Sequence, residues 1–239
     1  MKMFRFEVWT SVSVCLLVLA GCVTQGGAID ADSGETLQDG QTAQDYDHPG
    51  MLDPTQAVAQ APATFNVKFN TTQGDFVIQV NRDWSPNGAD RFYNLVKIGY
   101  FKDIVFFRGI EGFMIQFGIH GDPAVSAKWS ESNIKDDPAK TGVSNDVGYL
   151  TFAKTGRPNS RSTQFFINLG NNRRLDSMGF TPIGKVVSGM ENFKKLNTEY
   201  GENKPQDQGS FQSKGNPYIL GKYPKLDMIK SAEIVPAGK

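Results

Sequence analysis

The sequence predicts a mainly β fold, a closed antiparallel β-barrel of about eight strands capped by two α-helices. Short segments with alternating apolar residues recur from residue 64 onward, and only two stretches have the apolar period of a helix. No strand–helix–strand rhythm is present, which argues against a parallel sheet. The 239 residues are 39% apolar and 21% charged, as in ordinary globular proteins, so composition names no function.

A β-hairpin is predicted at the start of this domain. Apolar and polar residues alternate over 65–69 and again over 76–80, and the segment 71–74 between them has turn-forming residues. The apolar side chains of both strands are expected to face the barrel core.

Two helices are predicted, each from a start signal and an apolar face. Ser85 followed by Pro86 is typical of a helix start, and the apolar face that follows stops at Gly99. Ser188 and Glu191 have the spacing of a capping box, so a second helix is expected to start at Ser188.

The N-terminus has the layout of an export signal. Lys2 and Arg5 precede an apolar stretch, 12–20, that is too short to span a bilayer as a mature helix. The sequence Leu-Ala-Gly-Cys at 19–22 resembles the lipobox of bacterial lipoproteins. This resemblance implies removal of residues 1–21 and lipidation of Cys22; the alternative is a plain signal peptide with a chance cysteine nearby.

Disulfides are not expected in the mature protein. The two cysteines are Cys15 and Cys22, and Cys15 lies in the segment that would be removed.

Residues 22–63 are expected to form a flexible acidic tether, with the folded domain over 64–239. This tether has seven acidic residues, no Lys or Arg, and no sustained apolar period, so it cannot bury enough surface to fold. A coil of about 40 residues would hold the domain on the order of 35 Å from its anchor. The domain itself has a balance of +6 without a basic cluster, so no nucleic-acid partner is expected.

Three segments in order carry a family resemblance. Phe106–Gln116 contains an arginine followed at fixed spacing by Gly-Phe-Met-x-Gln, and it closely resembles the first cyclophilin signature. Ser162–Asn168 resembles the second signature, and Gly179–Val186 resembles the stretch that follows it. Because three ordered motifs are far more specific than one, the domain is identified as similar to cyclophilin-type peptidyl-prolyl cis/trans isomerases.

The resemblance implies the site residues. Arg108 would be catalytic, because a guanidinium donates hydrogen bonds and stays protonated at any working pH. The expected substrate-binding residues are Phe113, Met114, Gln116, Ala153, Lys154, Gln164, Phe166, Leu175 and Phe180. One extra residue between Ala153 and Pro158 leaves the alignment of 155–157 open.

No nucleophile, metal or cofactor is required by this chemistry. His48 lies in the tether and His120 stands alone beside the first motif, so neither suits a triad or a metal site. Without the order of the motifs, an apolar pair such as Phe113 and Met114 would be read as ordinary core.

The chain departs from the family pattern at several positions. Phe107 stands where the family often has His, Arg174 where the best-known members have Trp, and Phe180 where a His is common. Loss of the Trp is expected to weaken binding of cyclosporin. Residues 201–226 form an insertion that a minimal cyclophilin lacks, and its role is not readable from the sequence.

The expected function is isomerisation of X-Pro bonds in peptides and unfolded exported proteins by a monomer. The open alternative is a proline-peptide binding module or chaperone with little or no turnover. The expected location is a bacterial membrane reached through the lipid anchor. Val23 after Cys22 favours the outer membrane with the domain in the periplasm, the alternative being the extracellular face of the cell membrane.

Overall fold

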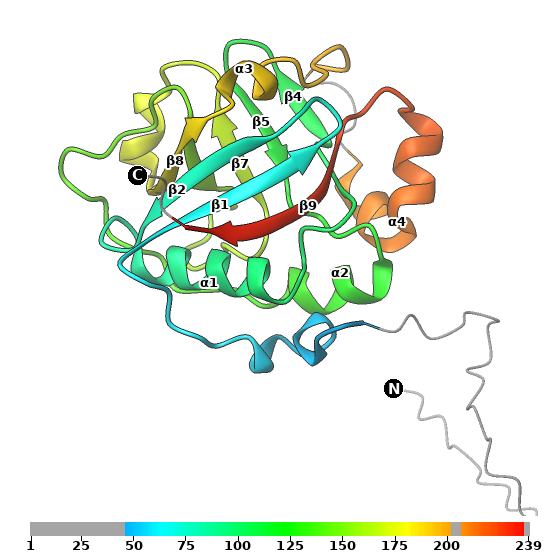
Figure 1. Cartoon of the computed structure of the whole chain (residues 1–239), viewed down its shortest axis with the longest axis horizontal. Coiled ribbons are helices and arrows are strands. Elements are labelled where there is room, and N and C mark those ends of the chain that lie inside the picture. Colours follow the sequence, from blue (N-terminus) through cyan, green and yellow to red (C-terminus); the bar gives the residue numbers. More distant parts are fainter. Residues whose placement is uncertain (1–45, 202–206, 237–239) are drawn as a thin grey trace, which may run out of the picture. The chain divides into compact units, whose positions relative to one another are not determined.

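A strongly curled antiparallel sheet forms the body of the molecule (Figure 1). The structure is a computed structural model that describes residues 46–201 and 207–236. In this part of the chain nine strands pair in the order β3-β9-β1-β2-β8-β6-β7-β5-β4. The strands are β1 (Thr64–Thr71), β2 (Phe76–Asn81), β3 (Ile104–Val105), β4 (Arg108–Ile110), β5 (Met114–Phe117), β6 (Tyr149–Phe152), β7 (Phe165–Asn168), β8 (Pro182–Ser188) and β9 (Met228–Val235).

The helices lie around this sheet. The described α-helices are α1 (Pro86–Lys97), α2 (Pro123–Ser130), α3 (Met190–Phe193) and α4 (Gln208–Lys222). Three short 3-10 helices accompany them, namely η1 (Pro49–Met51), η2 (Pro54–Gln56) and η3 (Arg173–Met178).

The predicted hairpin is confirmed. β1 pairs antiparallel with β2 across the turn, with Phe69 opposite Phe76 and Val67 opposite Ile78. The rings of Phe69 and Phe76 stack with centroids 5.1 Å apart, and all four side chains are buried in the core.

The mainly β, antiparallel fold is confirmed, whereas a closed barrel is not. The edge strands of the described sheet are β3 and β4, and no pairing joins them among the described residues. Only Phe106 and Phe107 separate these two strands in the chain, so the covalent backbone brings the two edges near one another. The sheet therefore curls into a half-barrel without a complete ring of hydrogen bonds.

The first predicted helix is confirmed as α1, but its cap is not the one that the sequence suggested. Ser85 occupies the N-cap position, and its hydroxyl donates to the carboxylate of Asp137 instead of capping the helix. The same carboxylate accepts the backbone N–H groups of Asn87 and Gly88, each at 3.0 Å. A residue fifty positions away thus supplies the oxygen that the first turn needs.

The second predicted helix is wrong at its start and in its length. Ser188 is the last residue of β8, and α3 covers only four residues after it. Gly189 lies between them with φ of 79°, so it acts as the N-cap and no side-chain capping bond forms. Phe193 of α3 is buried, and its ring packs edge-on against Phe76 with centroids 5.3 Å apart.

The end of the expected tether is part of the folded unit. Residues 46–63, here called the strap, lie along α1 and α2 (Figure 1). Asn94 of α1 exchanges two hydrogen bonds with the backbone of Ala59, and the indole N–H of Trp129 in α2 donates to the carbonyl of Met51 at 3.0 Å. The strap needs no core of its own, because the domain surface satisfies its backbone. The boundary expected at residue 64 is therefore too late.

The remaining N-terminal predictions concern residues 1–45, which lie outside the described residues. Within 46–201 and 207–236, no helix is both long enough and apolar enough to cross a bilayer.

Candidate active site

A cavity of about 350 Å³ lies on the face of the sheet that turns away from the main core. It brings together Arg108 and all nine residues expected to bind substrate. The described lining residues are Arg108, Phe113, Met114, Gln116, Ala153, Lys154, Thr155, Ser160, Ser162, Gln164, Phe166, Leu175, Phe180 and Gln208.

Strand geometry places the central residues in one row. Arg108 on β4 pairs with Gln116 on β5, which pairs in turn with Phe166 on β7. Successive strand residues point to opposite faces, so Ile115 and Phe117 enter the main core while Gln116 faces the cavity.

Amide side chains orient the guanidinium. Arg108 donates through Nη1 to Oε1 of Gln116 at 3.2 Å, and Nε2 of Gln116 donates to Oε1 of Gln164 at 2.8 Å. Because Gln116 uses its oxygen toward Arg108 and its nitrogen toward Gln164, its amide orientation is defined at both ends. The guanidinium is thus held at the polar side of the cavity.

The other side of the cavity is apolar. Met114, Phe166 and Leu175 are buried there, with Phe113 and Phe180 partly buried against them. The rings of Phe166 and Phe180 meet edge-to-face at 5.9 Å. Such a preformed concave apolar surface is the right kind of site for a compact ring.

Cations cover the outer faces of two of these rings. The guanidinium of Arg174 lies 5.2 Å from the ring centre of Phe113, and Nζ of Lys154 lies 5.6 Å from that of Phe180. Arg174 therefore lies beside the cavity without providing an indole donor, as expected from the sequence.

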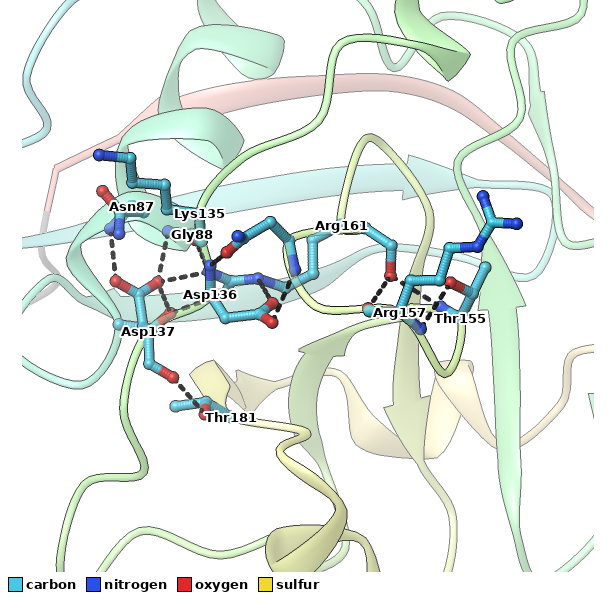
Figure 2. Close-up of polar contacts among 12 residues, drawn as sticks. Asn87, Gly88, Lys135, Asp136, Asp137, Thr155, Arg157, Arg161 and Thr181 are labelled. Carbon is cyan, nitrogen blue, oxygen red and sulfur yellow. Dashed lines mark hydrogen bonds and ion pairs between the residues drawn. The ribbon is translucent and has the colours of Figure 1, made fainter.

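A buried ion-pair network supports the rim of the cavity, and Figure 2 shows its course from the start of α1 to the segment 155–161. Arg161 is 2% exposed and its Nη2 lies 2.9 Å from Oδ2 of Asp137. The same nitrogen donates to the carbonyl of Lys135, and Nε lies 3.3 Å from Oδ1 of Asp136. One side chain thus ties the rim segment to two acidic residues of another loop.

The rim segment is further fixed by reciprocal bonds. The backbone N–H of Asn159 donates to Asp136, and that of Asp136 donates to the side chain of Asn159, each at 2.8 Å. Thr155 donates its backbone N–H to the hydroxyl of Ser160. These contacts give Thr155 and Ser160 defined places at the cavity edge.

Hydrogen bonding lowers the pKa of Asp137. Burial by itself would raise it, but the hydroxyl of Ser85, two backbone N–H groups of α1 and the guanidinium of Arg161 outweigh this effect and hold it below the usual 3.8. The ionised carboxylate is thus the form that the fold requires.

Four lining residues were missed by the sequence reasoning: Thr155, Ser160, Ser162 and Gln208. The first lies in the segment whose alignment the extra residue made uncertain. Ser162 is the first residue of the second motif, and Ser160 lies two residues before it, so extending that motif would have found Ser160. Gln208 belongs to the insertion, where no local pattern distinguished it.

The histidines occupy structural positions. Nδ1 of His48 accepts the backbone N–H of Gly50, and Nδ1 of His120 accepts that of Asp122. In the described part of the chain no group of three His, Cys, Asp or Glu side chains could hold a metal ion.

The lining as a whole suits an extended peptide. An apolar pocket can accept a proline ring, a guanidinium stands at its edge, and amide and hydroxyl groups follow the rest of the groove. This combination defines a peptide-binding site in which bond rotation can be assisted without a covalent intermediate.

Comparison with known proteins places the chain in a family. The sequence pattern of the family described as "Cyclophilin type peptidyl-prolyl cis-trans isomerase/CLD" matches residues 66–214. Peptidyl-prolyl cis-trans isomerase B of Escherichia coli (strain K12) is 34% identical over 137 residues, which are 54% of this chain and 82% of that protein. Peptidyl-prolyl cis-trans isomerase cypE of Dictyostelium discoideum is 35% identical over 147 residues, 59% and 91% of the two chains.

A solved structure agrees with the fold. The cyclophilin type peptidyl-prolyl cis-trans isomerase of Cryptosporidium parvum superposes with a TM-score of 0.55 at 24% identity, covering 73% of this chain and 99% of that one. The chain belongs to the cyclophilin family, and it is a peptidyl-prolyl cis-trans isomerase.

Proposed function

We propose that the chain assists the folding of exported proteins by rotating their X-Pro bonds, with Arg108 as the catalytic residue, while a lipid on Cys22 holds it at a bacterial membrane. The observation that carries the proposal is the orientation of Arg108 by Gln116 at the edge of an apolar pocket.

The chemistry requires no bond to break. Rotation about a peptide bond meets a barrier of roughly 18–20 kcal/mol, because the nitrogen lone pair is delocalised into the carbonyl. The cis and trans forms of an X-Pro bond are nearly balanced, yet they exchange over tens of seconds or more. A donor that hydrogen-bonds the proline nitrogen localises the lone pair and so lowers the barrier. The guanidinium of Arg108 is the donor that we assign to this step.

The apolar residues hold the ring during rotation. Phe113, Met114, Phe166 and Leu175 surround the proline, with Phe180 closing the far side. Gln164 and the backbone around Ala153 and Lys154 bind the main chain on the other side of the rotating bond. A related Cryptosporidium parvum isomerase, 26% identical, was crystallised in the presence of the dipeptide Ala-Pro, which supports a proline-containing ligand.

Magnetisation-transfer NMR on a proline-containing peptide tests the mechanism. Arg108→Ala should lower catalysed exchange about a hundredfold or more, the size of effect seen when one charge-stabilising donor is removed from an active site. Peptide affinity should change much less, because the apolar pocket is intact. Arg173→Ala is the matched control, since Arg173 is exposed, pairs with Asp146 and does not line the cavity.

Unchanged turnover in Arg108→Ala would overturn the assigned role. A wild-type protein that binds the peptide without speeding its exchange would instead support the binding-module alternative.

The location is proposed from the lipobox resemblance. The outer membrane, with the domain in the periplasm, is the favoured site, because Val23 rather than Asp follows Cys22. Exported polypeptides emerge unfolded in that compartment, so their X-Pro bonds would be accessible there.

Labelling cells with a radioactive fatty acid tests the anchor. The wild-type chain should take up label and fractionate with outer membranes, whereas Cys22→Ser should take up none and become soluble. Cys15→Ser is the control, because Cys15 lies before the expected cleavage point. Equal labelling of wild type and Cys22→Ser would refute lipidation at this cysteine.

A further inference from the structure

The expected insertion, residues 201–226, reaches the active site. Its helix α4 lies at a flank of the sheet (Figure 1), and Gln208, the first residue of α4, lines the same cavity as Arg108 and Gln116. Gln208 is half-buried, so its side chain has both a supporting surface and access to the cavity.

One aromatic contact sets where α4 begins. Phe211 is 1% exposed, and its ring lies edge-to-face on Phe107 with centroids 5.9 Å apart. Gln208 is three residues before Phe211, so the two side chains share a face of the helix. Because Phe107 directly precedes Arg108, this contact places Gln208 on the Arg108 side of the cavity. The unusual Phe at position 107 is thus the surface on which the insertion docks.

The middle of α4, at its kink, is attached to the domain by polar contacts. Asn216 donates its backbone N–H to the carbonyl of Gly121 at 2.9 Å and its side-chain amide to the carbonyl of Asp103 at 2.8 Å. Gly215 makes this approach possible, since its φ is 69° and a Cβ there would lie 2.2 Å from the oxygen of Gly121. The helix is therefore held in its first turn and at its kink, and Gln208 is placed before a substrate arrives.

The chemistry of Gln208 suits the main chain of a peptide. A carboxamide donates and accepts hydrogen bonds without charge, which matches the alternating N–H and C=O groups of an extended backbone. The proline ring belongs to the apolar side of the cavity, so a group beside α4 would meet residues further along the peptide.

We propose that α4 is a wall of the substrate groove, and that Gln208 is a specificity-determining residue which binds the peptide main chain outside the X-Pro pair. The inference rests on the isomerase function and extends its substrate class from short proline peptides to longer extended polypeptides.

Two peptides that differ only in length test the proposal. An extended peptide of about four residues covers at most ~14 Å, whereas one of about ten residues covers ~35 Å and can reach past the pocket. Gln208→Ala should lower the ratio of kcat/KM for the long peptide to kcat/KM for the short one by about three- to tenfold, as expected for one lost hydrogen bond. The ratio of the two Kd values, from calorimetry, should shift in the same sense.

Gln212→Ala is the matched control, because it removes the same side chain one turn later in α4 and Gln212 does not line the cavity. It should leave both ratios at their wild-type values. Circular dichroism with a thermal scan checks that α4 remains folded in both variants.

A wild-type ratio in Gln208→Ala would overturn the proposal, and so would an equal loss for both peptides, since that would mean an effect on the common X-Pro site. Failure of the isomerase function is distinguishable, because the wild-type chain itself would then be inactive on both peptides. In that case the ratio of the Kd values for the long and the short peptide, compared between the wild type and Gln208→Ala, still decides whether Gln208 binds the longer peptide.

Discussion

The strap and α4 are both additions to the curled sheet, yet they are attached to different apolar clusters. The strap, residues 46–63, is bound by hydrogen bonds between its backbone and side chains of α1 and α2, and it adds Met51 and Ala61 to the main core. α4 is bound by an apolar cluster that includes Phe211 and Ile219 from the insertion, and Val105, Phe107 and Ile119 from the domain.

The two attachments also differ in function. None of the described strap residues lines the active-site cavity, whereas α4 contributes Gln208 to it. Of the two, α4 buries the larger pair of apolar side chains, Phe211 and Ile219 against Met51 and Ala61, so α4 should be the firmer attachment. A firm attachment is what a substrate-contacting wall needs.

The largest effect is expected from the apolar contact of α4. Phe211→Ala should lower the free energy of unfolding by about 3–5 kcal/mol, because it empties a fully buried aromatic site. Urea unfolding measures the loss. It should also reduce activity on long peptides as Gln208→Ala does, since the wall loses its support. A loss below about 1 kcal/mol would show that the cluster does not hold α4.

A pH effect is expected where the two additions meet the same segment. Asn216 of α4 contacts Gly121, Tyr46 of the strap donates to Asp122 at 2.5 Å, and His120 lies buried beside both. Burial lowers the pKa of His120 to about 4 from its usual 6.5, against the opposing effect of Asp122.

The direction of this pH effect on stability follows from proton binding. Between pH 6.5 and about 4 the unfolded chain binds a proton at His120 and the folded chain does not, so stability falls as the pH falls through this window. Over this pH range the free energy of unfolding should fall by about 3 kcal/mol in total. Urea unfolding at several pH values should show the slope in the wild type and a flatter slope in His120→Gln. Identical slopes would contradict the assignment.

Asp137 provides a separate window for comparison. The pKa of Asp137 is lowered in the folded state, so its contribution to the stability of the fold is complete at pH values above its usual pKa of 3.8. This contribution is lost only as the pH falls further, through the folded pKa. The two groups can therefore be told apart in one titration.

The smallest effect is expected in the strap. Trp129→Phe removes the indole N–H that donates to the carbonyls of Gly50 and Met51, and it should cost about 1–3 kcal/mol. Limited proteolysis within 46–63 should become faster while kcat/KM stays constant, because Trp129 does not line the cavity. A loss of activity would mean that the strap influences the site after all.

Local signals in the sequence were sufficient for some elements. Strict alternation identified the β1–β2 hairpin, and Ser85-Pro86 with an apolar face identified α1. The short cavity strands were different, since every residue of β5 and β7 is buried and alternation is invisible in them. There only the motif resemblance brought Arg108, Gln116 and Phe166 to one site.

The limit of prediction from the sequence is clearest in the insertion. Gly215 and Pro217 are poor helix formers, so the sequence did not predict α4. Its backbone is kinked at Gly215, and its support comes from Phe107, about a hundred residues earlier in the chain. The second predicted helix failed for a related reason, since Gly189 adopts a positive φ that the capping-box spacing does not reveal.

By itself the sequence determined the antiparallel β class, the first hairpin and helix, and the family, because these depend on short-range periodicity or on motifs. The roles of the ten expected site residues remain a prediction, and the structure brings all ten to one cavity. The tertiary structure alone decided that the sheet is curled without hydrogen-bonded closure and that the strap belongs to the folded unit. It also decided that Asp137, from a distant loop, caps α1 and that Gln208 lines the cavity. Each of these results depends on contacts between residues distant in the chain, where neither local propensity nor spacing carries information.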